Sequence, residues 1–168
     1  GEYKNTKKTG KGKEYNEEGD WIFEGNYLNG KRNRKGIEYK KEFNNIVHGY
    51  DCYKFEGEYL NGIKNGFWKL YKNNRLIFEG NYLNNKKNGT GKEYYSKNKI
   101  LFQGKYLDDK KWEGKGYNPN GQLEYEIKNG CGFIKEFEKF FCSIKFEGEY
   151  KNGEKNGKGK EYKDGQLI

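Results

Sequence analysis

The side chains that could carry out catalysis are few and scattered along the chain. Those that could act as nucleophile, base or soft metal ligand are three threonines and His48, Ser96, Ser143, Cys52, Cys131 and Cys142. Nucleophilic catalysis needs a base beside the nucleophile, and zinc sites need closely spaced Cys or His ligands, whereas no CxxC pair is present. We therefore predict a non-catalytic chain without metal or cofactor, in which His48 is a solvated loop residue. Cys131 and Cys142 fit small buried hydrophobes as well as reactive thiols, and the odd number of cysteines indicates reducing, intracellular surroundings.

Two other patterns suggest chemistry but fit it poorly. The glutamates that recur with the repeated Phe-Glu-Gly-Glu-Tyr pattern could form acid–base pairs: Glu56, Glu58, Glu79, Glu147 and Glu149. Because they alternate with the aromatic residues and glycines, we interpret them as one solvated face of a sheet. Residues 153–158 look like a phosphate-binding loop, but only three residues separate the two glycines, Gly159 stands where Ser or Thr is required, and no helix is expected to follow.

The stronger signal is the placement of basic residues in a chain of net charge +9. They recur at one point of a repeated segment, in its predicted turn: Lys31, Arg32, Arg34, Lys64, Lys86, Lys87, Lys110, Lys111 and Lys155. If equivalent turns align along a sheet edge, these residues form a basic ridge roughly 50 Å or longer. Near an anionic bilayer each contributes ~1 kcal/mol, which predicts weak binding to anionic phospholipid. The alternatives are solvated lysines that protect sheet edges from pairing and, less favoured, a groove for single-stranded nucleic acid.

Internal repeats position these residues. Related segments begin at Phe23, Phe55, Phe78, Phe102 and Phe146, so successive starts differ by 32, 23, 24 and 44 residues. The period is about 23 residues, with a degenerate copy before the last start and an insertion of about nine residues near 43–49 that we expect to form a loop. The predicted units are 1–22, 23–54 with the insertion, 55–77, 78–101, 102–123, 124–145 and 146–168, in one array. Because neither end carries a polar cap, we expect the array to be part of a longer protein.

Each unit has the pattern of one β-hairpin. Phe55, Gly57 and Tyr59 alternate with glutamates, which is the period of a half-buried strand, and the Asn-Gly pairs that follow favour a tight turn with positive φ. The chain has no Ala or Met and 25 Gly, which argues against helical folds. We predict an all-β protein, an elongated single-sheet meander of about seven antiparallel hairpins. Aromatic rings from adjacent strands are expected to lie across Gly57, Gly80, Gly104 and Gly148.

The pattern (F/Y)-x-G-x-Y-x-N-G-x-x-N-G-x-G-x-x-x-(Y/F), clearest in residues 55–71 and 146–162, resembles the membrane occupation and recognition nexus (MORN) repeat. The resemblance covers essentially the full chain. Tyr59, Tyr82 and Tyr150 stand where Trp is more usual, Arg34 replaces a turn glycine, and residues 124–145 depart further. The resemblance implies an elongated, twisted meander that acts as a non-catalytic targeting or assembly module. The family includes junctophilins, plant phosphatidylinositol phosphate kinases and protist cytoskeletal scaffolds, and both phosphoinositide or phosphatidic acid binding and dimerisation are associated with such arrays.

The resemblance leaves the partner open. The leading hypothesis is an intracellular scaffold or membrane-proximal interaction module, cytoplasmic or peripheral at a membrane or the cytoskeleton. The alternatives are protein assembly or dimerisation, including antitoxin-like neutralisation of a partner, and a regulatory segment of a phosphatidylinositol phosphate kinase. Trp21, Trp68 and Trp112 share no repeat position, so they are either local packing or exposed anchors for a protein partner. No segment approaches the ~18 apolar residues that spanning a membrane requires, and no small-molecule substrate is expected.

Overall fold

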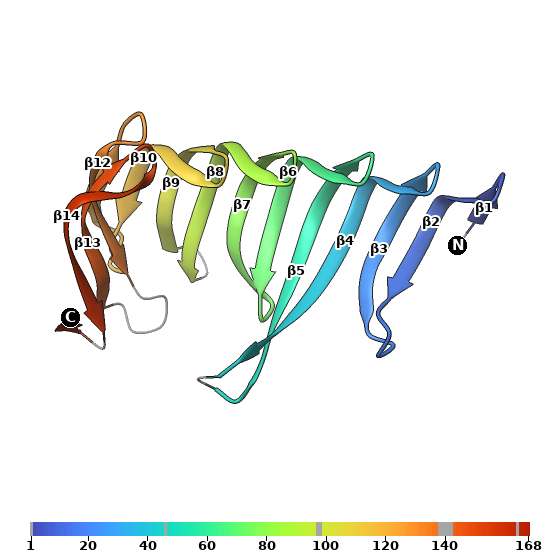
Figure 1. Ribbon diagram of the computed structural model, residues 1–168, viewed down its shortest axis with the longest axis horizontal. Coiled ribbons are helices and arrows are strands. Elements are labelled where there is room, and N and C mark those ends of the chain that lie inside the picture. The colour runs from blue at the N-terminus through green and yellow to red at the C-terminus, as the bar shows by residue number, and fades with distance from the viewer. Residues whose placement is uncertain (1, 46, 97–98, 138–142, 164) are drawn as a thin grey trace. The chain divides into compact units, whose positions relative to one another are not determined.

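The computed structural model describes all residues except 1, 46, 97–98, 138–142 and 164. Its described part is all-β, without helix, as the sequence predicts (Figure 1). The first strands are β1 (Glu2–Lys4), β2 (Lys7–Tyr15), β3 (Trp21–Leu28), β4 (Lys31–Asn44), β5 (Gly49–Leu60), β6 (Ile63–Lys72), β7 (Arg75–Leu83) and β8 (Lys86–Ser96). The others are β9 (Lys99–Leu107), β10 (Lys110–Tyr117), β11 (Leu123–Ile127), β12 (Gly132–Phe137), β13 (Ile144–Lys151), β14 (Glu154–Lys163) and β15 (Gln166–Leu167).

The strands follow one another as an antiparallel meander, which confirms the predicted fold class. Strands β1 to β11 form one sheet in sequence order, and β12 to β15 form a second, four-stranded sheet. The break falls in the degenerate repeat, where β11 and β12 are short and the turn between them closes through a single bridge, Lys128 to Cys131. The chain divides into two compact units, residues 1–86 (unit 1) and 87–168 (unit 2). No helix in the described part is long and apolar enough to cross a membrane.

Two-residue turns join the two strands of each repeat. Both turn residues have positive φ, as at Asn29 (51°) and Gly30 (80°), and at Asn61 (53°) and Gly62 (88°). Asp108 and Asp109 adopt the same conformation in unit 2, with φ of 49° and 72°. Turns of this kind match the right-handed twist of antiparallel strands, and Asn, Asp and Gly tolerate them best. The predicted Asn-Gly hairpins are therefore confirmed.

Aromatic rings packed on bare backbone form the core. In unit 1, Phe23, Tyr27, Tyr59 and Trp68 are buried, and the Phe23 ring lies edge-on to both tyrosine rings. A Cβ atom added at Gly57 would clash with the indole ring of Trp68, and one added at Gly104 or Gly148 would clash with the Phe102 or Phe146 ring. The prediction of a ring from the adjacent strand is confirmed at Gly57, whereas at Gly104 and Gly148 the ring comes from the same strand, two residues earlier.

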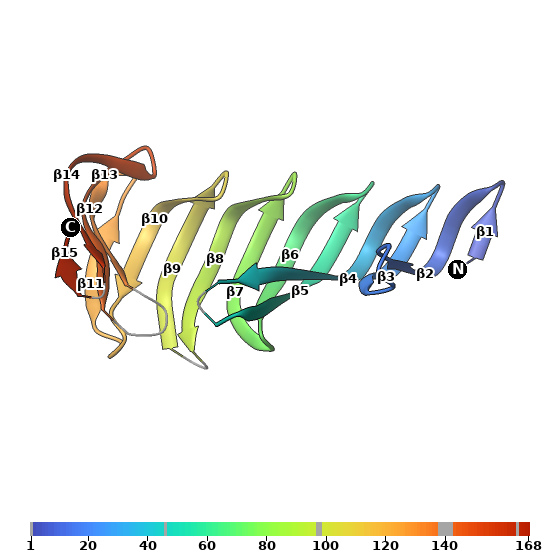
Figure 2. The ribbon, with the colours of Figure 1, turned by 60° about the horizontal axis from the view of Figure 1, so that its bottom comes forward.

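The insertion in the second repeat is not the loop that we expected. It lengthens β4 and β5 into one continuous hairpin whose register runs to Asn44 opposite Gly49, and it projects past the neighbouring strands (Figure 2). We call residues 40–53 the arm. The Asp51 carboxylate fixes its base, because it accepts hydrogen bonds from Asn44 (2.9 Å) and Asn73 (3.0 Å) and lies 2.7 Å from the Lys72 ammonium. The prediction failed because the inserted residues continue the strand pairing.

Candidate functional site

The hairpin turns of successive repeats are joined into a line within each unit. In unit 1 the Gly30 N–H donates to the Lys8 carbonyl (2.9 Å), and the Gly62 N–H donates to the Arg32 carbonyl (2.7 Å). The Asn85 N–H bonds the Lys64 carbonyl (3.1 Å) in the same way. Unit 2 repeats the pattern: the Asp109 N–H donates to the Lys87 carbonyl, and the Gly153 N–H donates to the Gly130 carbonyl, both at 2.9 Å. Equivalent turns therefore lie side by side along one edge in each unit, which we call the turn edge.

Each turn carries two cross-strand pairs that point to opposite faces of the sheet. In each unit separately, we define the inner face as the side of its buried Phe rings, such as Phe23 in unit 1 and Phe102 in unit 2, and the outer face as the other side. The inward pairs are Tyr27–Arg32, Tyr59–Lys64, Tyr106–Lys111 and Tyr150–Lys155. The outward pairs, one residue closer to the turn, are Leu28–Lys31, Leu60–Ile63 and Leu107–Lys110. Because side chains alternate along a strand, consecutive basic residues of one turn lie on different faces.

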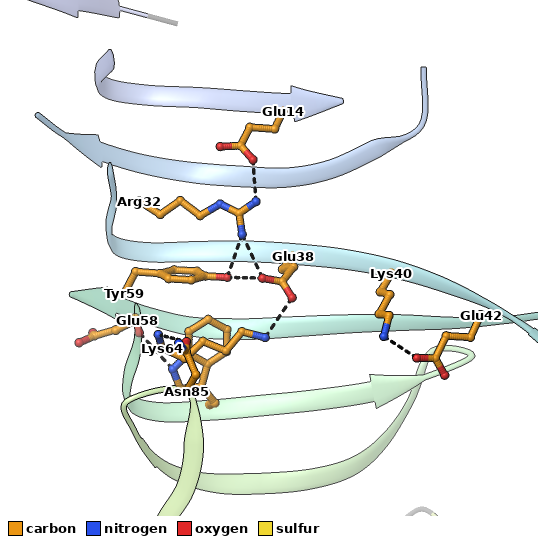
Figure 3. A network of polar contacts seen from close by, with 10 residues as sticks. Glu14, Arg32, Glu38, Lys40, Glu42, Glu58, Tyr59, Lys64 and Asn85 are labelled. Atoms are coloured by element: carbon orange, nitrogen blue, oxygen red, sulfur yellow. Dashed lines mark hydrogen bonds and ion pairs between the residues drawn. The ribbon is translucent and has the colours of Figure 1, made fainter. Parts of the chain in front are cut away.

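The inward basic residues of unit 1 are held by carboxylates (Figure 3). The Arg32 guanidinium lies 2.6 Å from Glu14 and 3.0 Å from Glu38, while its carbon stands 4.1 Å from the centre of the Phe23 ring. The Lys64 ammonium lies 3.0 Å from Glu38. The Tyr59 hydroxyl donates to Glu38 at 2.6 Å. We call Glu14, Arg32, Glu38, Tyr59 and Lys64 the inner ladder.

Electrostatics inside the inner ladder favours the ionised carboxylates. Burial opposes ionisation of Glu38, but the hydrogen bond from Tyr59 and the charges of Lys64 and Arg32 outweigh it and lower the pKa of Glu38 from its ordinary value. Burial also raises the pKa of Tyr59, together with the adjacent Glu38 charge. The pKa of Lys64 is lowered, because burial outweighs the attraction of Glu38. This arrangement is structural, since every group in it is engaged by another part of the chain.

Unit 2 repeats the same arrangement. Glu93 lies 3.2 Å from Lys87 and 3.3 Å from Lys111. Lys155 stands 3.9 Å over the Phe146 ring and 2.9 Å from Glu161. Burial opposes the charge on Lys111, but Glu93 and Tyr125 raise its pKa overall.

The basic ridge expected from the sequence is therefore divided between two faces. Arg32, Lys64, Lys87, Lys111 and Lys155 lie inward in ion pairs, because a repeat that alternates faces places every second turn residue over the Phe and Tyr rings. Lys31, Arg34 and Lys86 are exposed at the turn edge of unit 1. In unit 2 Lys110 lies 2.8 Å from Glu154 and keeps 42% of its side chain exposed.

The three tryptophans have different environments. Trp68 is 1% exposed, and its indole N–H donates to the Glu58 carbonyl at 3.0 Å, so its ring is not available to a partner. Trp112 is half-buried, and its ring packs against the backbone of Gly130. Trp21 is 36% exposed, with its ring centre 4.6 Å from that of Tyr39. Trp21 is therefore the tryptophan of the three that presents the most surface to a partner.

The remaining predicted positions are also placed by the structure. His48 is exposed at the tip of the arm, as a solvated loop residue would be. Cys52 and Cys131 are free and exposed, so of the two interpretations left open for Cys131 the small buried hydrophobe is excluded, because the residue lies at the short turn of the degenerate repeat. Cys142 lies outside the described residues. No group of three His, Cys, Asp or Glu side chains that could hold a metal ion occurs among the described residues.

A cleft lies beside the base of the arm. Its volume is about 860 Å³, and the side chains that line it include Trp21, Tyr39, Tyr50 and Tyr53, with Glu18 and Lys41 among the charged ones. The apolar tip of the arm is exposed nearby at Phe43, Val47 and Tyr50. The cleft and tip together form an aromatic surface in unit 1.

Sequence reasoning missed a row of exposed leucines on the turn edge. Leu28, Leu60 and Leu83 in unit 1 are 51%, 53% and 47% exposed, and Leu107 in unit 2 is 41% exposed. Each directly follows a buried tyrosine of its repeat. The sequence does contain a signal for this row, because a leucine recurs at one fixed repeat position directly after the core tyrosine. Side chains alternate along a strand, so a residue next to a buried one lies on the opposite face.

The comparison with known families agrees with this geometry. The sequence model of the MORN repeat matches residues 1–21, 23–41, 55–67, 78–99 and 146–167, more than half of the chain. It does not match residues 124–145, where the structure has the short strands of the degenerate repeat. No curated protein matches the chain. With the antiparallel meander, its hairpin turns and these matches together, the chain belongs to the MORN repeat family.

Proposed function

We propose that this MORN array is a non-catalytic scaffold that attaches reversibly to the anionic surface of an intracellular membrane through its turn edge. MORN repeats form scaffold or interaction modules in general. The observation that supports the membrane proposal is the line of hydrogen-bonded turns in unit 1, which presents the exposed Lys31, Arg34 and Lys86 on one edge. Each basic residue near an anionic leaflet contributes ~1 kcal/mol, and this contribution falls off within a Debye length. Three such residues give adsorption that salt reverses.

Vesicle sedimentation tests this proposal. The wild-type chain is compared with the variant Lys31→Glu, Arg34→Glu, Lys86→Glu on phosphatidylcholine vesicles with and without phosphatidylserine, at low and high salt. The control variant, Lys11→Glu, Lys13→Glu, Lys40→Glu, makes the same change in net charge at exposed positions away from the turns. We expect binding to the anionic vesicles that is strongest at low salt, a loss of at least tenfold at low salt in the turn variant, and a smaller loss in the control. Equal losses in both variants would contradict a role for the turn edge.

A second candidate function, docking of a protein partner, is favoured by the arm. The arm is held at its base by Asp51, while Phe43, Val47 and Tyr50 are exposed beside an aromatic cleft. Exposed aromatic residues on a firmly held element are common anchors of protein interfaces. Light scattering over a range of concentrations tests self-association, with the variant Phe43→Ser, Tyr50→Ser as comparison. A strict monomer that also captures no partner would contradict this candidate.

A further inference from the structure

The turn edge of unit 1 carries apolar side chains at a position where the fold does not need them. Leu28, Leu60 and Leu83 each stand at the last residue of the first strand of a repeat, and about half of each side chain remains accessible. Ile63, opposite Leu60, is also exposed. Isolated exposed leucines are ordinary on protein surfaces. A leucine at the same place in three successive repeats is a pattern, and it gives this edge an apolar row.

The chain itself shows that a hairpin of this kind closes without leucine. In the first and last repeats the equivalent outward pairs are Lys4–Lys7 and Lys151–Glu154, and both hairpins have the same two-residue turn with positive φ. The inward pair, in contrast, keeps Tyr opposite Lys or Arg in these repeats as well, at Tyr3–Lys8 and Tyr150–Lys155. The inward residues therefore serve the fold, and the outward leucines need another explanation.

Two of the three leucines of unit 1 are matched across the turn by a cation, while Leu60 lies opposite Ile63. Leu28 lies directly opposite Lys31. Leu83 ends β7 and Lys86 begins β8, with Asn84 and Asn85 as the turn between them. Neighbouring hairpins of a meander lie ~10 Å apart, so the leucines are spaced along the edge with polar and basic groups between them. A leucine beside a lysine suits the boundary between acyl chains and headgroups. The leucine can enter the acyl region while the long lysine side chain reaches back to the headgroup level.

We propose that Leu28, Leu60 and Leu83 insert into the acyl boundary of an anionic bilayer while Lys31 and Lys86 lie at its headgroup level. This inference rests on the membrane attachment proposed above, and it adds a contribution that salt does not screen. A bilayer fits this surface better than a folded protein partner, because a row of single leucines separated by basic residues offers no contiguous apolar patch for an interface core. Insertion of the accessible half of three leucines is expected to strengthen vesicle partitioning by about fiftyfold to a thousandfold.

The test uses the full chain and phosphatidylcholine vesicles that contain phosphatidylserine. In the variant Leu28→Ser, Leu60→Ser, Leu83→Ser we expect partitioning to fall at least tenfold, and binding at high salt to disappear. The control variant Leu123→Ser, Leu167→Ser removes exposed leucines that lie outside the turn edge and is expected to bind like wild type. Circular dichroism and the unfolding midpoint establish that each variant is folded. The variant Leu28→Phe, Leu60→Phe, Leu83→Phe keeps the edge apolar and should retain or strengthen binding.

A depth measurement separates insertion from surface adsorption. In the Leu60→Trp variant we expect the added indole fluorescence to shift to shorter wavelength on vesicle binding and to be quenched by brominated acyl chains, relative to the wild-type signal of Trp21, Trp68 and Trp112. If the wild type binds at low salt but the serine variant binds equally well and no quenching occurs, insertion is refuted while charge-driven attachment stands. If the wild type binds no anionic vesicle at low salt, the proposed attachment fails, and insertion fails with it.

Discussion

Glu38 is the best position at which to test whether the inner ladder stabilises the fold. Its carboxylate accepts a hydrogen bond from Tyr59 (2.6 Å) and lies 3.0 Å from both Arg32 and Lys64, so it joins the three strands β4, β5 and β6 of two successive repeats (Figure 3). The substitution Glu38→Gln keeps the size of the side chain and one acceptor oxygen but removes the charge. We expect it to lower the free energy of unfolding by about 2–4 kcal/mol, because two half-buried cations lose a counterion and three charge-assisted hydrogen bonds are weakened.

A matched control lies on the same strand. Glu42 is 2.6 Å from Lys40, but 47% and 59% of the two side chains are exposed. Glu42→Gln should change the free energy of unfolding by less than about 0.5 kcal/mol, since exposed ion pairs contribute little. The two substitutions are chemically identical, so the difference between their effects reports the environment of the carboxylate.

The effect of Glu38→Gln should depend on pH in a definite direction. The pKa of Glu38 is lowered in the folded state from its ordinary value of 4.5. Its contribution to stability is therefore fully present above pH 4.5 and is lost as the pH falls through the lowered pKa. Urea unfolding of wild type, Glu38→Gln and Glu42→Gln, measured by circular dichroism between neutral and acidic pH, gives the difference directly. Two results would refute the ionic role of the ladder. One is a difference in unfolding free energy between wild type and Glu38→Gln that stays constant below pH 4.5, and the other is a difference no larger than that caused by Glu42→Gln.

Three further predictions test the backbone and the arm. Arg34 has a φ of 59° where the equivalent Gly66 has 85°, so Arg34→Gly should stabilise the fold by about 0.5–1 kcal/mol and Gly66→Arg should destabilise it, both measured by urea unfolding. Gly57→Ala should destabilise the fold by about 2–4 kcal/mol, because its Cβ would clash with the Trp68 ring. Gly49→Ala should be nearly neutral in the same assay, because its Cβ meets only Val47 at ordinary contact distance. Asp51→Asn should speed amide hydrogen exchange in residues 40–53 without a comparable change in the sheet core, because it removes the carboxylate that Lys72 and Asn73 hold. Exchange of the arm that is unchanged by this substitution would contradict the role of Asp51.

The fold could be predicted from the sequence because its determinants are local. The alternation of Phe55, Gly57 and Tyr59 with glutamates is a strand signal, and Asn61-Gly62 is a turn signal that the observed φ values of 53° and 88° match. The packing of rings on glycine also followed from one repeat, since Gly57 and the ring of Trp68 oppose each other on neighbouring strands. A composition poor in aliphatic residues is sufficient for a buried core, because each buried aromatic side chain removes ~150–250 Å² of its surface from water.

The site was harder to predict because it depends on which face each turn residue occupies. Arg32 and Lys31 are neighbours in the sequence, yet one lies over the Phe23 ring and the other is exposed on the outer side. Treating all basic turn residues as one ridge ignored the change of face at every residue. The same omission hid the leucines, since alternation places Leu28 on the face opposite to its neighbour Tyr27. The arm was missed because nothing in its composition distinguishes a longer hairpin from a loop.

Each turn is divided into an inward pair on the side of the buried rings and an outward pair on the opposite face. The inward pair keeps Tyr opposite Lys or Arg from Tyr3–Lys8 to Tyr150–Lys155, and the hydroxyls of Tyr27, Tyr59 and Tyr150 donate to glutamates of neighbouring strands. The outward pair varies between Lys–Lys, Leu–Lys, Leu–Ile and Lys–Glu without altering the turn. A repeat array built in this way can change the charge and apolarity of its turn edge from one hairpin to the next at little cost in stability. Variation confined to the outward pair is what a scaffold needs if each stretch of its edge meets a different part of the same surface.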